Sequence, residues 1–169
     1  MPTVRDVTKD LAVAGLAGYV GTKAMEPVSM ALYERESEHA KQQEDAARPG
    51  PPYQIAATKI ASRFGINLHG AALDRAPLVM HYGLALSWSP LYTLVRRTRR
   101  VHPVVGGLAT GAAMSLIADE AMTPLLGFSA PNSAYPLSTH LRWFVAHLVF
   151  GLAVATTTEA VWAARGRRP

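Results

Sequence analysis

Long apolar stretches alternate with short charged ones along this 169-residue chain. Three stretches contain no Asp, Glu, Lys or Arg: residues 76–95, 101–118 and 143–158. A fourth apolar stretch, 11–22, reaches membrane length only if Lys23 and Glu26 are included. A helix needs about 20 mostly apolar residues to cross the hydrocarbon core of a bilayer. The pattern therefore predicts an all-α, four-helix transmembrane bundle, with helices over about 10–33, 76–96, 101–125 and 141–163.

A soluble helical bundle is the alternative, because the mean hydropathy of the chain is only +0.09. The surface helices of soluble bundles carry charged residues on one face, and the three charge-free stretches have no such face. Small residues four apart, such as Gly107 and Gly111, are typical of closely packed membrane helices. We therefore expect residues 1–169 to form a single integral membrane domain.

Basic residues predict the direction in which the helices run. Cytoplasmic loops of membrane proteins are rich in Lys and Arg. The connection between the second and third helices reads RRTRR over 96–100, whereas residues 127–140, before the fourth helix, contain neither Lys nor Arg. Alternation then places both termini in the cytoplasm, where Arg5, Lys9, Arg165, Arg167 and Arg168 agree with this orientation.

The segment between the first two helices, 34–75, should lie outside. Its first part, 34–52, is charged and ends in Pro51-Pro52, which predicts an extension of the first helix followed by a loop. Residues 53–64 have apolar positions at near-helical spacing and predict a short amphipathic helix. This helix could lie on the outer membrane surface or pack over the mouth of the bundle.

Ionisable residues inside the predicted spans gather at one depth. At about 1.5 Å per residue, all four helices bring such residues to a layer near the outer face. These residues are Glu26, His81, Asp119, Glu120 and His147. His140 lies seven residues before His147 and could join them from the rim. Ionisable groups are costly in lipid, so they usually face the bundle and have a partner there.

Several kinds of chemistry fit imidazoles together with carboxylates. They can bind a divalent transition metal, relay protons or, less readily, hold a haem between two facing histidines. No Glu-x-x-His pair lies within the predicted spans, which weakens a di-iron assignment. The simplest alternative is structural: the groups satisfy one another, and Lys23 pairs with Glu26 three residues later.

The two halves of the chain resemble each other in this region. Gly18 precedes Glu26 by eight residues, and Gly111 precedes Asp119 by eight. A histidine follows in the next helix of each half, at His81 and at His147. This pattern is typical of a duplicated helical hairpin, although a match this short can also arise by chance.

Other classes of function are disfavoured by what the sequence lacks. There is no Cys, which excludes disulfides, thiolate metal sites and thiol catalysis. No nucleophile elbow, phosphate loop or metalloprotease motif is present, so the chain is not expected to be an enzyme. The arginines of 96–100 have no aromatic residues between them, so contact with anionic lipid is preferred to nucleic acid.

Three short motifs lie within about residues 76–152: His81-Tyr82-Gly83, Pro124-Leu125-Leu126-Gly127 and His147-Leu148-Val149-Phe150-Gly151. Together they resemble the YagU-like family of small bacterial inner-membrane proteins. The resemblance implies a small multi-helix protein of the inner membrane, and it supplies no catalytic residues. The charged stretch 34–50 has no counterpart in it.

We therefore expect a multi-pass inner-membrane protein that handles a proton or a metal cation near its outer face, as a small transport or homeostasis factor. The alternative is an accessory or scaffold subunit of a larger membrane complex. In that case the glycine-rich faces and the arginines would contact other subunits or a second copy.

Overall fold

The computed structural model describes residues 4–166, and every regular element in this range is helical. The four long helical segments are α1 (Val4–Glu34), α4 (Ala71–Thr98), the run from α5 to α6, and α7 (Leu137–Ala164). The run consists of α5 (Pro103–Met114), the π-helix η1 (Ser115–Met122) and α6 (Thr123–Leu125). The short helices are α2 (Glu38–Ala47), α3 (Pro52–Arg63) and the 3₁₀ turn η2 (Asn132–Ala134). The all-α prediction is confirmed.

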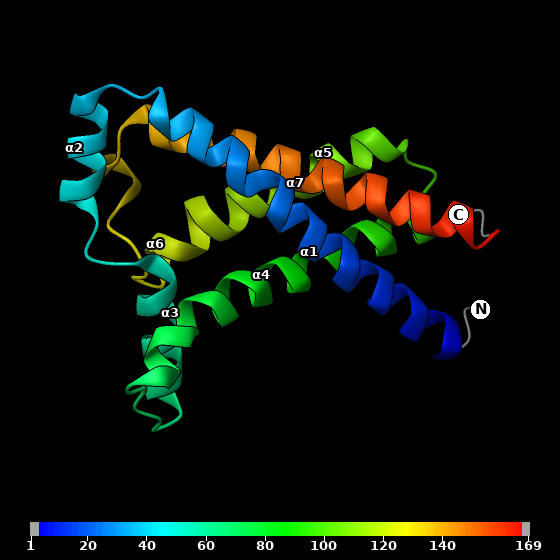
Figure 1. Ribbon diagram of the computed structural model, residues 1–169, viewed down its shortest axis with the longest axis horizontal. Coiled ribbons are helices and arrows are strands. Elements are labelled where there is room, and N and C mark those ends of the chain that lie inside the picture. Colours follow the sequence, from blue (N-terminus) through cyan, green and yellow to red (C-terminus); the bar gives the residue numbers. More distant parts are fainter. Residues whose placement is uncertain (1–3, 167–169) are drawn as a thin grey trace.

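The long helices run lengthwise through the molecule, with α1 and α4 crossing each other near its middle, and α2 and α3 lie at one end (Figure 1). α1 contacts both α4 and α7, and α5 packs against α7. The described ends of the chain lie together at the end opposite α2 and α3 (Figure 1). Arg167 and Arg168 lie outside the described residues, as does the side chain of Arg5.

Two of these segments are long and apolar enough to cross a bilayer. Pro103–Leu125 has a mean hydropathy of 1.2 and Leu137–Ala164 one of 1.6. The core helix of a soluble protein can pass the same test, but it is mostly buried, whereas only 39% of each apolar window is buried here. α1 and α4 have the length but not the hydropathy. Lys23 and Glu26 interrupt α1, whereas polar side chains such as those of His81, Ser87 and Ser89 lower the hydropathy of the charge-free stretch of α4.

Glycines allow α5 and α7 to pack backbone against backbone. A Cβ atom on Gly111 would overlap the main-chain carbonyl of His147, and one on Gly151 would overlap the carbonyl of Gly107. On α1, a Cβ atom on Gly21 would lie 2.7 Å from the ring of Phe150. The glycine spacing in the sequence is therefore a packing motif, as expected for small residues between closely packed helices.

The segment between the first two long helices, 34–75, differs from the expectation in one respect. Residues 38–47 do not extend the first helix but form the separate helix α2, because the Ser37 hydroxyl accepts a hydrogen bond from the Ala40 N–H at 3.2 Å and caps a new helix. The amphipathic helix expected over 53–64 is present as α3. It packs against α4, so it lies over the bundle and not apart from it.

Candidate functional site

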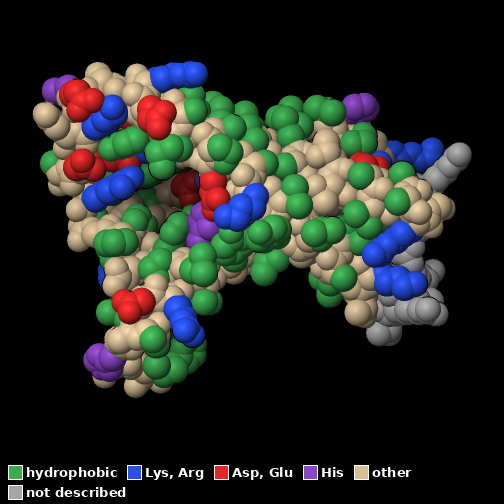
Figure 2. Space-filling view, viewed as in Figure 1, with side chains coloured by type: hydrophobic (Ala, Val, Ile, Leu, Met, Phe, Trp, Pro, Cys, Tyr) green, Lys and Arg blue, Asp and Glu red, His purple; other side chains and the backbone are tan. Residues whose placement is uncertain are grey.

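A cavity of about 930 Å³ lies between the long helices at the end that carries α2 and α3. α1, α3, α4, η1 and α7 form its walls, together with the connection from residue 126 to 135. Figure 2 shows a hollow at this end, with acidic and histidine side chains at its edge. Four of the five residues predicted to share a layer line this cavity: Glu26, His81, Asp119 and His147.

The first acid–imidazole pair joins α1 to α4. His81 Nε2 lies 3.7 Å from Glu26 Oε1, and the other carboxylate oxygen of Glu26 accepts a hydrogen bond from Lys23 at 2.9 Å. The ring of Tyr53, on α3, stands edge-on to the His81 ring with 4.9 Å between centroids. The predicted pairing of Lys23 with Glu26 is therefore present, and it leaves one carboxylate oxygen facing the histidine.

The second pair joins η1 to α7. His147 Nδ1 lies 3.3 Å from Asp119 Oδ2 and 2.8 Å from the main-chain carbonyl of Trp143. A carbonyl oxygen can only accept, so Nδ1 carries the proton and donates it. His147 is buried, with 6% of its surface exposed. Its Nε2 makes no hydrogen bond with any residue that the structure describes, and as the unprotonated nitrogen it can accept one.

The two pairs have the same arrangement in the two halves of the chain. In each half the acid lies on the first helix of a hairpin and the histidine on the second: Glu26 and His81, then Asp119 and His147. Both pairs line the same cavity. The repeated pairing agrees with the duplicated hairpin that the sequence predicts.

Glu120 does not join this group, contrary to the prediction. It lies next to Asp119 in the π-helix, and its carboxylate contacts His140 Nδ1 at 2.8 Å. His140 lies about two turns of α7 before His147, nearer the N-terminus of that helix. His140 Nε2 donates to the carbonyl of Asn132 at 3.1 Å. Pro124 has no N–H for the carbonyl of Glu120, and Asn132 Nδ2 donates to that oxygen instead, at 2.8 Å. These contacts fix the end of η1 and α6.

The metal site expected from the five residues is not formed. No three or more His, Asp or Glu side chains within residues 4–166 gather in a way that could hold a metal ion. The cause is geometric: Glu26 is shared with Lys23, Glu120 turns to His140, and His147 Nδ1 is occupied by a carbonyl. Two separate acid–imidazole pairs are suited to exchanging protons.

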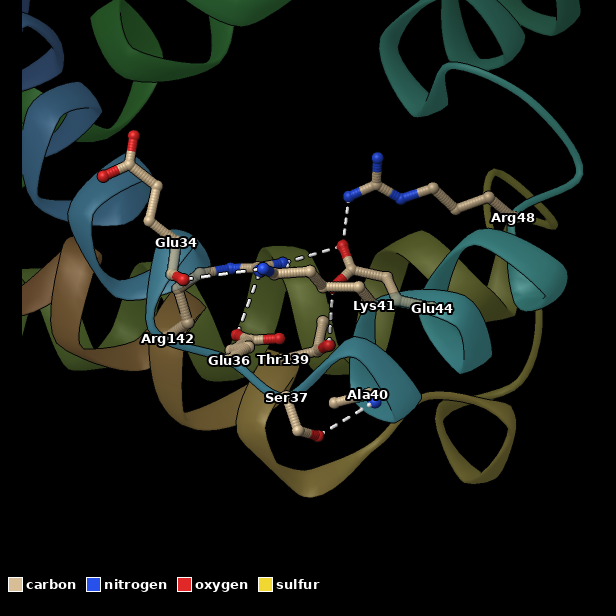
Figure 3. A network of polar contacts seen from close by, with 9 residues as sticks. All are labelled: Glu34, Glu36, Ser37, Ala40, Lys41, Glu44, Arg48, Thr139 and Arg142. Carbon is tan, nitrogen blue, oxygen red and sulfur yellow. Dashed lines mark hydrogen bonds and ion pairs between the residues drawn. The ribbon is translucent and has the colours of Figure 1, made fainter.

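A buried charge network, drawn in Figure 3, lies at the α2 end of the cavity, where Arg48 and Arg142 line the wall. Arg142, at the start of α7, donates to both carboxylate oxygens of Glu44 at 2.7 Å and to Glu36 at 3.0 Å. Thr139 donates to Glu44 at 2.7 Å, and Arg48 also pairs with Glu44. Burial raises the pKa of Glu44, but these hydrogen bonds and the Arg142 charge outweigh it and hold the pKa below its usual range.

A second network lies at the opposite end, among residues assigned by sequence to lipid contact. Arg96 donates to both oxygens of Glu159, at 2.6 and 3.1 Å, and Tyr92 donates to the same carboxylate at 2.8 Å. Arg97 pairs with Asp10 at 2.9 Å. Two of the four arginines of 96–100 therefore tie α4 to α7 and α1, which leaves Arg99 and Arg100 exposed for other contacts.

The sequence did not indicate the aromatic part of the site. Tyr53, Trp88 and Trp143 line the cavity, and no motif in the sequence indicated that they would. The signal for the network around Arg142 was present but unused. An arginine near the start of an apolar helix needs an acidic partner, and residues 34–52 contain several acids, Glu44 among them. No family model, curated protein or solved structure matches this chain.

Proposed function

We propose that this chain is a multi-pass membrane protein that binds and releases protons in a cavity near its outer face, as a small transport or homeostasis factor. One observation carries the proposal: two acid–imidazole pairs, Glu26–His81 and Asp119–His147, line the same cavity. An imidazole titrates near neutral pH, and a carboxylate beside it provides a second site for the same proton.

The proposed membrane arrangement has four passes, through α1, α4, α5–α6 and α7, with both termini in the cytoplasm. Two of these segments have the apolar length to cross, and the described chain ends lie at one end of the molecule. The charges of α1 and α4 are largely paired within the protein, as in Arg96–Glu159 and Arg97–Asp10, which lowers the cost of placing them at membrane depth. An inner-membrane location also agrees with the YagU-like resemblance.

The absence of cysteine makes the topology straightforward to test. Single cysteines would be introduced at Ser133 and at Thr98, two exposed positions at opposite ends of the bundle, with the parent chain as a cysteine-free control. A maleimide that cannot cross membranes should label Ser133→Cys in spheroplasts and Thr98→Cys only after lysis. Equal labelling of both variants before lysis would contradict the four-pass arrangement.

Proton binding can be measured directly by infrared difference spectroscopy of the purified protein between about pH 5 and pH 9. The wild-type protein should show a carboxyl C=O band that changes with pH, and Asp119→Asn should lose it. Asp45→Asn, on the exposed face of α2, is the matched control and should leave the band unchanged. Identical difference spectra for wild type and Asp119→Asn would overturn the assignment of the proton site.

A further inference from the structure

The size of the cavity exceeds what proton exchange requires. Its volume of about 930 Å³ falls at the upper end of the range for small-molecule sites, about 300–1,000 Å³. A proton path needs only a narrow file of polar groups. The space therefore indicates room for a ligand with a substantial body.

The apolar part of the cavity wall is mainly aromatic and thioether in character. Four of the six methionines of the chain line it: Met25, Met30, Met80 and Met122. The indole rings of Trp88 and Trp143 and the ring of Tyr53 add aromatic surface. Methionine adapts its shape to irregular apolar bodies, and aromatic rings attract organic cations through their faces. Both properties fit a bulky apolar ligand that carries positive charge.

The charges of the cavity favour the same sign of ligand. Its two cationic residues, Arg48 and Arg142, are already paired with Glu44, and Arg142 also binds Glu36. Arg142 in addition lies over the Tyr33 ring, 4.8 Å from its centroid. The positive charge at the outer end is therefore compensated and would not attract an anion strongly.

The acidic groups of the inner wall are less completely compensated. Asp119 has His147 as its ion-pair partner, at 3.3 Å, and this histidine is charged only when it is protonated. Glu26 turns one oxygen to Lys23 and the other toward His81. With both histidines neutral, the wall carries excess negative charge, and that charge lies next to apolar and aromatic surface.

We propose that this cavity binds a lipophilic organic cation, with its charge near Asp119 and its apolar substituents against the indole rings and methionines. The inference rests on the proposed function, because the cation and a proton would compete for the same acidic wall. A metal ion would leave the apolar surface unused and would lack a third ligand among the described residues. An amphipathic anion would face Asp119 and Glu26 without a free cation.

Competition with protons depends on all the groups around Asp119. The titratable residues nearest to it come from every packed element: His147 on α7, Glu120 beside it on η1, Tyr53 on α3, His81 on α4 and Glu26 on α1. The same cavity is also lined by Tyr33, Tyr135 and the two arginines Arg48 and Arg142, both of which are paired with Glu44. Protonation of the imidazoles or of the carboxylates lowers the negative charge of the wall. Cation affinity should therefore increase as pH rises.

The test uses two probes of the same shape and opposite charge, tetraphenylphosphonium and tetraphenylborate. Each would be titrated into the full-length protein in lipid nanodiscs, with empty nanodiscs as the blank. Tryptophan fluorescence reports occupancy, since Trp88 and Trp143 line the cavity whereas Trp162 is buried elsewhere. The cation should bind at least about tenfold more tightly than the anion, a difference of about 1.4 kcal/mol.

Two variants complete the design. Asp119→Asn should weaken binding of the cation about tenfold or more, and Trp143→Phe should reduce the fluorescence change without removing the acidic wall. Glu38→Gln, whose side chain is 81% exposed on α2, is the control and should bind as the wild type does. Equal affinity for both probes, or cation binding that is unaffected by Asp119→Asn, would overturn the proposal.

The two experiments distinguish a failure of the cation site from a failure of the proposed proton site. A pH-dependent carboxyl band without phosphonium binding would remove the cation and leave the proton site in place. Phosphonium binding that depends on Asp119, without a titrating band, would remove proton exchange and leave a cation site.

Discussion

Arg142 and Glu44 form a buried ion pair across 98 residues of chain, with only 4% and 0% of their side chains exposed. Both carboxylate oxygens accept from the same guanidinium nitrogen, at 2.7 Å each. The pair joins α2, in the charged outer segment, to the start of α7 (Figure 3). It therefore fixes the part of the chain that closes the cavity.

Removal of one member of this pair should be strongly destabilising. Arg142→Met leaves the Glu44 carboxylate buried with only Thr139 and Arg48 to compensate it. An uncompensated buried charge of this kind costs about 3–5 kcal/mol. The free energy of unfolding, measured by denaturant titration in detergent, should fall by about that amount.

The control is an ion pair on the surface. Glu38→Gln removes the partner of Lys41 on the exposed side of α2, a contact worth about 0–1 kcal/mol. The double variant Arg142→Met/Glu44→Met removes both charges of this pair and leaves Glu36 as the one remaining buried acid of the network, so it should be less destabilised than Arg142→Met alone. If Arg142→Met cost no more than Glu38→Gln, the network would not stabilise the outer end.

Glu44 also predicts how stability depends on pH. Its pKa in the folded protein is lowered, mainly by the hydrogen bonds from Arg142 and Thr139, which outweigh burial. A group with a lowered folded pKa contributes its stabilisation fully above its unfolded pKa, about 4.3, and loses it as pH falls through the folded value. Wild-type protein should thus lose stability below about pH 4.3 more steeply than Glu44→Gln. If the free energies of unfolding of the two proteins fell in parallel with pH, this prediction would be wrong.

The apolar pattern was sufficient to predict the helices but not their charge partners. Hydrophobic length and periodicity depend on neighbouring positions, so the ranges 71–98 and 137–164 lie within a few residues of the expectation. The separate helix α2 was missed, because its start depends on one hydroxyl, that of Ser37, and its position depends on contact with Arg142 across the fold. Neither the Ser37 cap nor the contact with Arg142 produces a periodic pattern of apolar residues in the sequence.

The sequence predicted how far along the helices the site residues lie, but not which way their side chains face. A rise of about 1.5 Å per residue places Asp119 and Glu120 in the same layer, and the structure does so. Which of two adjacent carboxylates faces the cavity depends on the helix turn, and the π-helix η1 alters that turn between residues 115 and 122. As a result Asp119 faces His147 and Glu120 faces His140.

The glycine contacts between α5 and α7 predict a strong effect from one added methyl group. In Gly111→Ala the Cβ atom would overlap the carbonyl of His147, so the helices must separate. Forced overpacking usually costs about 1–3 kcal/mol, and here it would also displace His147 relative to Asp119. The unfolding free energy should fall by that amount, and the infrared band assigned to Asp119 should shift.

Gly83→Ala is the matched control for this change. It lies within α4, and a Cβ atom there meets nothing within 4 Å. Alanine favours a helix over glycine by about 1 kcal/mol, so this variant should be as stable as the wild type or more stable. If Gly83→Ala and Gly111→Ala lowered the free energy of unfolding equally, close packing of α5 against α7 would not be the cause of the loss.

The hydrogen bond from His147 to Trp143 predicts a single tautomer. Because the Trp143 carbonyl accepts at 2.8 Å from Nδ1, the neutral ring should carry its proton there and leave Nε2 free toward the cavity. Nitrogen-15 NMR of the labelled protein in detergent should give a protonated Nδ1 and an unprotonated Nε2. Asp119→Asn should keep this tautomer, since the carbonyl remains, whereas exposed His39 on α2 has no such acceptor among the described residues and serves as the reference. A protonated Nε2 on neutral His147 would remove the free acceptor from the cavity and, with it, the role of this residue in receiving a proton.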